Sequence, residues 1–323
     1  MTRVMAIAVL LVMAAGARGE SVRLASYNIE NFHTLFEHRR MSQVPAPTLP
    51  EGMDWKELIR EERNQNQEDK WEIAQVLSHP RVDPDIIVIQ EGCLQEDLAY
   101  FNKQWLGGAY ETIIVFPTNT DRNQTLAMML KAGFKVLQQN DQYHLERDPV
   151  LNERSERLFA RGPAFCLVET PGGYRMWVGN THQKSKSGNS VEVTAWRNRE
   201  AARTREIILE LEQADPHPVI LLGDFNDELG IQEYELEGGG DVIANMVGDP
   251  KDGLHLATRQ LALDGEISFG GYWFSNRRSL IDHVIVTKEL RDNVQDVYVF
   301  RSGMAPVASD HYPVIVELKL PQE

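Results

Sequence analysis

The stretch Asp85-Ile86-Ile87-Val88-Ile89-Gln90-Glu91 places an unbroken run of branched apolar residues between polar ones. A strand with one wet face alternates apolar and polar side chains, so such a run is typical of a strand covered on both faces. Leu126–Leu130 and Ala164–Val168 show the same pattern. The sequence therefore predicts several strands that lie inside the molecule.

Shorter patterns around these runs predict further elements. Strands are expected at Val22–Ile29, Met176–Asn180, Pro218–Leu222, Ile281–Thr287 and Tyr312–Leu320. A helix is predicted over Arg197–Gln213, with Ala201, Thr204, Ile208 and Leu211 as its inner stripe. Another is predicted after the cap residue Asp69, with Trp71, Ala74 and Leu77 at helical spacing. The charged segment Glu51–Asn66 indicates a solvated helix or an insertion.

Strands outnumber helices in this reading, and several strands are apolar throughout. Two packed sheets with helices on their outer faces explain that pattern. A doubly wound parallel sheet needs a crossover helix between neighbouring strands, but some links are too short for one. Examples are Gly133–Val136 after Leu130 and Pro171-Gly172-Gly173 before Tyr174.

The N-terminus is typical of a signal peptide. Arg3 precedes the apolar run Val4–Met13, which is too short to span a bilayer, and Ala17-Arg18-Gly19 offers small residues for cleavage. We expect residues 1–19 to be removed and residues 20–323 to form a single domain that is secreted or periplasmic. A buried N-terminal helix is the alternative reading. No stable membrane insertion and no protein partner are predicted.

The net charge of −15 argues against a broad basic surface of the kind that dominates non-specific duplex binding. Nucleic acid stays possible, because carboxylates that hold a cation contribute negative charge themselves. The two cysteines, Cys93 and Cys166, are too few for a disulfide framework. They either form one disulfide or remain two buried thiols.

Polar residues recur where the expected strands begin or end, which is where a rigid sheet can present several side chains to one point. They are Asn28, Glu30, Glu91, His182, Asp224, Asn226, Asp227, Asp282, His283, Asp310 and His311. Taken singly, segments such as Gly223-Asp224-Phe225-Asn226 also fit an ordinary turn. Their joint occurrence at strand ends favours one shared site.

Metal-assisted attack on phosphorus is the chemistry that uses this set. A hard divalent cation offsets the charge of a phosphate ester, and carboxylate or amide oxygens suit Mg²⁺, Mn²⁺ or Ca²⁺. Glu91 is the best single ligand candidate. His182 and His311 can donate to ester oxygens, with Asp282 orienting His311. Asp224 can take a proton from the attacking water, and Asn226 can steady the phosphate or that water.

These segments resemble the endonuclease/exonuclease/phosphatase superfamily over Val22–Leu320. The resemblance rests on Ser26-Tyr27-Asn28-Ile29-Glu30-Asn31, Gln90-Glu91, Asn180-Thr181-His182, Gly223-Asp224-Phe225-Asn226, Ile281-Asp282-His283 and Ser309-Asp310-His311. It implies an α+β fold, a four-layer α/β/β/α sandwich whose two central sheets are mostly antiparallel. It also implies that Asn28, Glu91 and Asp310 hold the metal, expected to be Mg²⁺ with Mn²⁺ or Ca²⁺ as alternatives.

The same resemblance implies that His182, Asp224, Asn226, Asp282 and His311 are catalytic and that Arg161 contacts phosphate. His182 fits the deoxyribonuclease and sphingomyelinase branches, but its carboxylate partner has no clear counterpart; the loop Pro117–Thr125 offers Asp121. Bacterial extracellular nucleases have a run similar to His182-Gln183-Lys184-Ser185-Lys186 and an aromatic patch similar to Tyr272-Trp273-Phe274. Substrate contacts are therefore expected from Asn180, Lys184, Lys186 and Trp273, with Arg277 and Arg278 nearby.

The first functional reading is a non-specific endonuclease that cuts DNA or RNA. The second is a phosphatase or a lipid phosphodiesterase on the same scaffold, acting on a monoester, an inositol phosphate or sphingomyelin. The third is a binding module that has lost catalysis, which the intact Glu91, Asp224, Asn226, Asp310 and His311 argue against.

Overall fold

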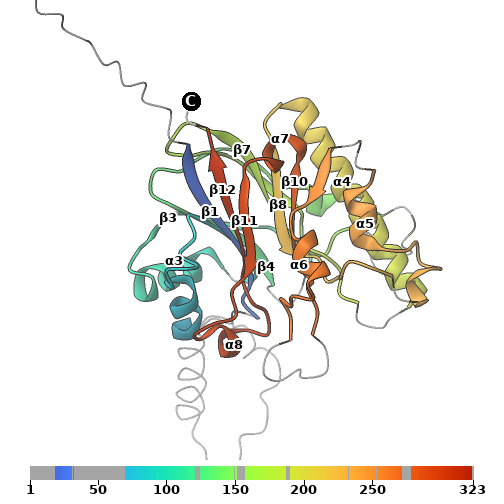
Figure 1. The fold of residues 1–323 in the computed structure, drawn as a ribbon, viewed down its shortest axis with the longest axis horizontal. Coiled ribbons are helices and arrows are strands. Elements are labelled where there is room, and N and C mark those ends of the chain that lie inside the picture. Colours follow the sequence, from blue (N-terminus) through green and yellow to red (C-terminus); the bar gives the residue numbers. More distant parts are fainter. Residues whose placement is uncertain are drawn as a thin grey trace, which may run out of the picture.

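Two six-stranded sheets face each other in the computed structural model, with helices on their outer sides (Figure 1). The structure describes residues 19–30, 32, 70–92, 94–120, 124–148, 150, 157–186, 190–231, 233–249, 251, 253–270 and 278–321. The expected sandwich of two sheets between helices is confirmed.

The first sheet has the strand order β11-β12-β1-β2-β4-β3. Its strands are β1 (Glu20–Asn28), β2 (Ile86–Gly92), β3 (Tyr110–Phe116), β4 (Thr125–Lys131), β11 (Val294–Val299) and β12 (Val314–Leu320). β1 and β2 are parallel, and the other neighbours are antiparallel.

The second sheet has the strand order β5-β6-β7-β8-β10-β9. Its strands are β5 (Lys135–Asn140), β6 (Ala164–Glu169), β7 (Arg175–His182), β8 (Val219–Asp224), β9 (Leu254–Leu256) and β10 (Asp282–Thr287). Here β7 and β8 are the parallel pair. Each sheet therefore has one central parallel pair whose carboxyl ends lie side by side.

The helices form the two outer layers. A helical segment at 70–77 and α3 (Gln95–Trp105) cover the first sheet, while α4 (Val191–Ala214) and α5 (Val242–Val247) cover the second (Figure 1). Shorter helices are η1 (Gln142–Leu145), η2 (Glu233–Glu235), α6 (Arg259–Leu263), α7 (Lys288–Arg291) and α8 (Ala305–Ala308). None of the helices among the described residues combines the length and the apolar character needed to cross a membrane.

Burial on both faces explains the unbroken apolar runs. In β2, Ile86 and Val88 lie in the core between the two sheets, whereas Ile87 and Ile89 pack under the outer helices. β8 repeats the pattern, with Ile220 and Leu222 inside and Leu221 under α4. A strand that is buried on both faces has no solvent-exposed side, so its sequence does not alternate between apolar and polar residues.

The strands and helices given residue ranges in the sequence analysis are confirmed where the structure describes them, with ends that shift by a few residues. The helix at Arg197 starts earlier, at Val191, because the Ser190 hydroxyl accepts a hydrogen bond from the Val193 amide and caps it. The link Pro171–Gly173 joins β6 to β7 as a hairpin, as expected. The link Gly133–Val136 instead carries the chain from β4 of one sheet to β5 of the other.

Several expectations fall outside the described residues, namely the signal peptide segment 1–18, Glu51–Asn66, Asp69 and Cys93. Cys166 is a free cysteine in the core between the sheets. Burial raises the pKa of its thiol to about 12, so the thiol is protonated and unreactive at neutral pH.

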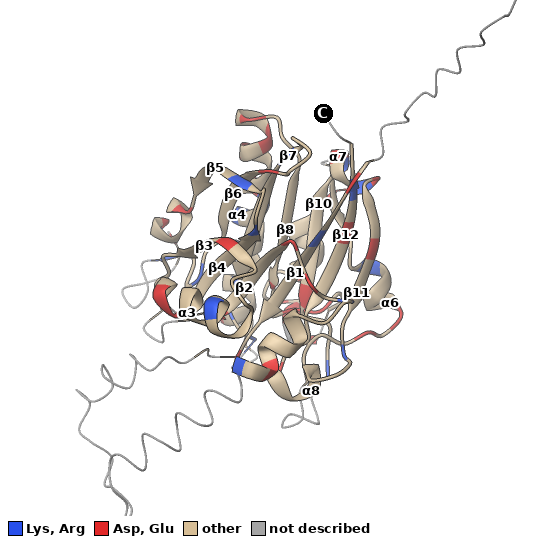
Figure 2. Cartoon of the chain, turned by 90° about the vertical axis from the view of Figure 1, so that its left-hand side faces the viewer, with Lys and Arg blue, Asp and Glu red and all other residues tan. Residues whose placement is uncertain are grey.

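Charged residues of both signs are interspersed over the described chain. In the view of Figure 2, lysine and arginine (blue) and aspartate and glutamate (red) both occur on the described helices and strands.

Gly223 is required by the close approach of β7 and β8. A Cβ added there would lie 2.0 Å from the Thr181 carbonyl oxygen, an atom of the paired backbone that cannot rotate away. We predict that Gly223→Ala lowers the free energy of unfolding by about 3 kcal/mol or more. The matched Gly92→Ala, whose new Cβ meets the Thr125 hydroxyl at 3.3 Å, costs less than about 1 kcal/mol. Urea denaturation measures both, and equal losses would contradict the prediction.

Candidate active site

The predicted residues converge at one end of the sandwich because of the two parallel pairs. β1 ends at Asn28 and β2 carries Glu91 near its end, while β7 and β8 end at His182 and Asp224. The antiparallel β10 begins at Asp282, directly opposite Asp224. His311 follows α8 and precedes β12. Both sheets thus contribute side chains to the same point.

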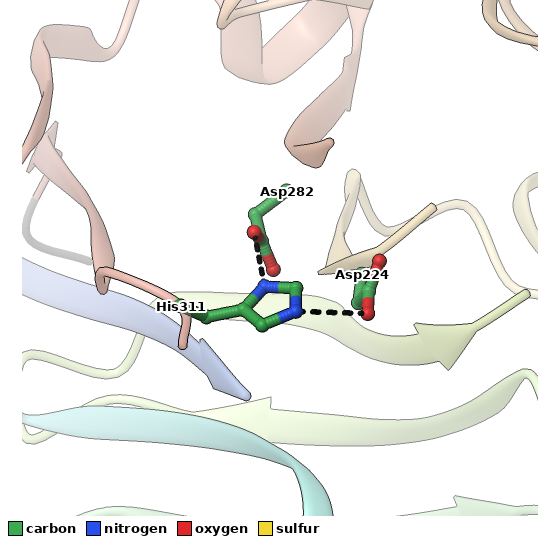
Figure 3. A group of neighbouring side chains, drawn as sticks. All are labelled: Asp224, Asp282 and His311. Atoms are coloured by element: carbon green, nitrogen blue, oxygen red, sulfur yellow. Dashed lines mark hydrogen bonds and ion pairs between the residues drawn. The ribbon is translucent and has the colours of Figure 1, made fainter. Parts of the chain in front are cut away.

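His311 lies between two carboxylates (Figure 3). Its Nδ1 is 2.8 Å from Oδ2 of Asp282, and its Nε2 is 3.7 Å from Oδ2 of Asp224. Burial by itself lowers the pKa of His311, but the two carboxylates outweigh it and raise that pKa to about 10. The imidazole is therefore a buried cation at neutral pH, held in orientation by Asp282.

Asp224 is the most connected carboxylate of the site. Its Oδ2 accepts a hydrogen bond from Asn28 Nδ2 at 3.0 Å and faces His182 Nε2 at 3.2 Å. Its Oδ1 accepts from the Asn226 backbone amide at 2.8 Å. Burial raises the pKa of Asp224 to about 7, with the His311 cation opposing the rise and Asp282 adding to it. A carboxylate with that pKa can exchange a proton near neutral pH.

His182 is buried beside Asp224. Burial, with the nearby Arg161 and His311 cations, holds the pKa of His182 well below its usual range, so the ring is neutral. A neutral ring that faces a carboxylate through Nε2 carries its proton there. Nδ1 has no hydrogen-bond partner among the residues that the structure describes. Asp121, considered above as that partner, lies outside them.

Three more carboxylates, those of Glu30, Glu91 and Asp310, gather next to His311. The Asp310 backbone amide donates to Glu30 Oε2 at 3.0 Å. Burial raises the pKa of Glu30 to about 7, and repulsion from Asp310 and Glu91 adds to the rise. Burial also raises the pKa of Asp310, where His311 opposes and Glu91 reinforces the rise. Carboxylates that repel each other in this way are stabilised by a cation among them.

The backbone at this end departs from ordinary geometry at three non-glycine residues. Glu30, Glu91 and Asn226 have φ values of 45°, 56° and 51°, in the left-handed region that such residues rarely adopt. Strained backbone of this kind concentrates at functional sites. Glu91 and Asn226 were both predicted to be functional, whereas Glu30 had been given no role.

Two groups of donors could hold a divalent cation. The oxygens of Glu91, Asp310 and Asn28 match the preference of Mg²⁺ and Mn²⁺ for oxygen ligands. A second group consists of Asp224, Asp282 and His311, whose ligand atoms all lie within 4.8 Å of one another. In that group the Asp282–His311 hydrogen bond occupies His311 Nδ1, which leaves Nε2 as the ring nitrogen that faces Asp224. The first group consists of oxygen ligands alone, although Asn28 Oδ1 also accepts a hydrogen bond from the Glu30 backbone amide at 3.1 Å.

Arg161 lies at the edge of the site. Its guanidinium donates to Gln124 Oε1 at 3.0 Å and to the Gln183 carbonyl oxygen at 3.2 Å. The Asn226 side chain donates to the same carbonyl at 3.0 Å. Arg161 and Asn226, which were predicted from distant segments, are thus linked through one backbone atom beside His182.

Asn180 does not lie where a substrate contact was expected. It is fully buried, and its amide donates to the carbonyl oxygens of Ile89 and Ala127, both at 2.9 Å. Its Oδ1 accepts from Gln90 Nε2 at 2.8 Å. Because these bonds use both N–H groups and the carbonyl, Asn180 joins the second sheet to the first instead of facing a ligand.

Lys186 also departs from its expected place on a basic rim. Its ammonium lies against the Asp227 carboxylate and 3.2 Å from Glu235 Oε1, both buried. The carboxylates compensate for burial of the ammonium, which would otherwise be costly. Lys184 extends over the Trp196 ring, 5.5 Å from its centroid. Trp273 and Arg277 lie outside the described residues, and Arg278 is exposed.

His283 points away from the site although it belongs to a matching motif. Its Nε2 donates to the Asp227 carbonyl oxygen at 2.9 Å, and its Nδ1 lies 2.8 Å from the Thr258 hydroxyl. Adjacent strand residues face opposite sides of a sheet, so Asp282 and His283 cannot both reach the same point. Burial lowers the pKa of His283 to about 4.

Comparison with known proteins identifies the family of the chain and the structures that share its fold. Residues 25–311 match the model of the Endonuclease/Exonuclease/phosphatase family. Among solved structures, truncated Caenorhabditis elegans TDP2 is similar at 18% identity, with 94% of this chain and 99% of that chain covered and a TM-score of 0.58. The mannosyl-6-phosphatase of Bacteroides thetaiotaomicron VPI-5482 gives 19% identity, coverage of 92% and 99%, and a TM-score of 0.59.

A third structure, D. rerio TDP2 complexed with single strand DNA product, is similar at 16% identity, with coverage of 92% and 98% and a TM-score of 0.54. At these identities the three structures show a shared fold and nothing further. A search of curated proteins found no match.

The hydrogen bond to Asp282 should control the protonation of His311. We predict that Asp282→Asn lowers the pKa of His311 by about one to three units, because a neutral amide no longer stabilises the imidazolium. Histidine ring resonances followed by NMR across pH measure this, with His217, which pairs with the surface residue Asp215, as internal control. An unchanged His311 pKa would show that Asp282 does not set its charge.

His283 should make the fold sensitive to acid. Its pKa is about 4 in the folded chain and 6.5 when exposed, so its contribution is fully present above pH 6.5 and is lost as pH falls through 4. We predict that this residue accounts for a loss of about 3 kcal/mol of unfolding free energy over that window. His283→Gln, which keeps a donor and cannot titrate, should flatten the measured pH dependence. Parallel curves for the two proteins would refute this.

Proposed function

The chain belongs to the endonuclease/exonuclease/phosphatase family, and from this we propose that it is a divalent-metal-dependent nuclease that cuts phosphodiester bonds of DNA or RNA. Members of this family are hydrolases that act on phosphoester bonds. We further propose that it acts outside the cytoplasm, because its N-terminal residues are typical of a signal peptide.

The arrangement of Asp282, His311 and Asp224 carries the proposal. One carboxylate orients the imidazolium through a 2.8 Å hydrogen bond, and the other lies on its far side. This places a buried cation beside a carboxylate that can take up a proton near pH 7. Hydrolysis of an anionic ester needs such a base for the water and such positive charge for the phosphate.

Each group then has a role. Asp224 accepts a proton from the attacking water, and the Asn28 amide keeps the Asp224 carboxylate in place. His311 and the neutral His182 donate through Nε2 to phosphate oxygens. These bonds stabilise the negative charge that develops on the phosphate and on the leaving oxygen during in-line attack. Arg161 and Asn226 lie together where they can bind the phosphate. A divalent cation bound by Glu91, Asp310 and Asn28 would supply Lewis-acid stabilisation of the ester.

A second candidate is a phosphomonoesterase that acts on a small substrate such as a sugar phosphate. The observation in its favour is the engagement of Lys186 by Asp227 and Glu235, which removes one cation from the rim that a long polyanion would contact. The mannosyl-6-phosphatase and the TDP2 complexed with DNA product have the same fold, so the fold accommodates both kinds of substrate.

A substrate panel separates these readings. We expect purified protein with Mg²⁺ or Mn²⁺ to cut plasmid DNA or RNA faster than it releases phosphate from mannose 6-phosphate, and chelation to abolish cleavage. Sphingomyelin and inositol phosphates complete the panel. Preferred hydrolysis of the monoester would support the second candidate, and cleavage that resists chelation would overturn the metal requirement.

Substitution tests the assigned residues. His311→Ala and Asp224→Asn should each lower kcat/KM by at least about 100-fold, because each removes a group that interacts with the reacting atoms. The variant His217→Ala, which removes a partly exposed pair with Asp215 remote from these residues, should leave kcat/KM unchanged. Full activity of either variant would contradict the catalytic role assigned to that residue.

A further inference from the structure

Helix α4 buries two charged side chains one turn apart, Arg197 and Glu200, at 0% and 1% exposure. Both lie on the inner face of the helix, beside apolar residues such as Ala201 that pack on the second sheet. Buried charges in an apolar layer are costly unless specific partners meet them. Their partners are the two loops that leave β7 and β8 at the active site.

Arg197 holds the loop after β8, residues 225–228. Its Nη2 donates to the Asn226 carbonyl oxygen at 2.9 Å and lies 2.6 Å from Oδ2 of Asp227. Asn226 has a left-handed backbone, with φ at 51°, and its amide donates to Asp224. Arg197 therefore holds the backbone carbonyl of Asn226, the residue whose backbone N–H donates to the Asp224 carboxylate.

Glu200 holds the loop after β7, residues 183–186. Its Oε2 accepts a hydrogen bond from the Lys184 amide at 2.8 Å. The preceding residue, Gln183, offers the carbonyl oxygen on which Arg161 and Asn226 converge, and its amide donates to the Asp224 carbonyl. Glu200 thus fixes the segment directly after His182.

An ion cluster joins the two loops behind the site. It consists of Lys186 from the loop after β7, Asp227 from the loop after β8, Glu235 from η2 and Arg197. Arg197, Asp227 and Glu235 are buried, and Lys186, which is partly exposed, also lies 3.7 Å from Glu228 Oε1. Such a network requires one arrangement of all its members, because displacing any of them leaves a buried charge unpaired.

We propose that Arg197 and Glu200 are positioning residues, and that α4 thereby sets the relative placement of His182, Asp224 and Asn226. Neither side chain is placed against the phosphate; each acts through a backbone hydrogen bond to an active-site loop. The inference rests on the proposed phosphoester hydrolysis. Small displacements of catalytic groups are expensive, since about 1 Å can cost about 100-fold in rate.

Hydrogen–deuterium exchange tests the proposal without reference to activity. The variants are Arg197→Met, Glu200→Leu and the conservative Glu200→Gln, whose amide oxygen still accepts from Lys184. Arg203→Met is the matched control, because Arg203 lies on the same helix but pairs with Glu146 and Glu210 at the surface. Peptides covering 182–186 and 224–228 should exchange at least about five-fold faster than in the wild type in Arg197→Met and Glu200→Leu. Their exchange rates should equal the wild-type rates in Glu200→Gln and Arg203→Met.

Activity provides the second arm, measured well below the melting temperature of every variant. Arg197→Met and Glu200→Leu should lower kcat/KM on the wild-type substrate at least about ten-fold, whereas Glu200→Gln and Arg203→Met stay within about two-fold. Wild-type exchange rates in both loops, or equal loss of activity in Arg203→Met, would overturn the positioning role. If Arg197→Met does not fold, the comparison of Glu200→Leu with Glu200→Gln tests the positioning role.

The two arms also separate this inference from the proposed function. A wild-type protein that cleaves no phosphoester would refute the proposed function, while the exchange data would still report on the loops. Full activity in Glu200→Leu beside an active wild type would instead refute positioning alone.

Discussion

A carboxylate can be buried only where other groups compensate its charge, and Asp224 is buried to 1% exposure. The compensation comes from both sides of the sandwich: Asn28 ends β1 of the first sheet, His311 lies just before β12 of that sheet, and His182 ends β7 of the second. The site therefore exists only when the sheets are packed in one register. The apolar core between them, the parallel strand pairs and the outer helices hold the sheets in that register, so the site depends on the whole scaffold.

Much of this could be predicted because the chemistry-bearing residues lie at the ends of strongly apolar strands. Runs such as Ile86–Ile89 identify doubly covered strands, and the polar residue after each run identifies the end where the site forms. Asn28, Glu91, His182 and Asp224 were located in this way, and Asp282 and His311 were located as polar residues where later strands begin. The structure brings these residues together.

Other parts could not be predicted, for physical reasons. The strands missing from the prediction, β3, β5, β9 and β11, are the edge strands of the two sheets. β5 and β11 have only exposed or half-buried residues, so they lack the unbroken apolar run that marks a strand covered on both faces. Lys186 and Asn180 were assigned to substrate because a polar residue next to a catalytic motif looks exposed; only the fold shows the carboxylates and carbonyl oxygens that occupy them. Arg197 and Glu200 resemble the solvated face of a helix in sequence, since nothing local reveals that distant loops will cover them.

The pairing of β1 with β12 joins the two extremes of the described chain, with Glu20 opposite Leu320. During synthesis β1 is made first and its partner last, so the first sheet cannot close until residue 320 has left the ribosome. An early fragment has β1 and β2 but lacks the strand that covers the other edge of β1 and also lacks His311. An incomplete chain therefore has neither a closed first sheet nor an assembled site.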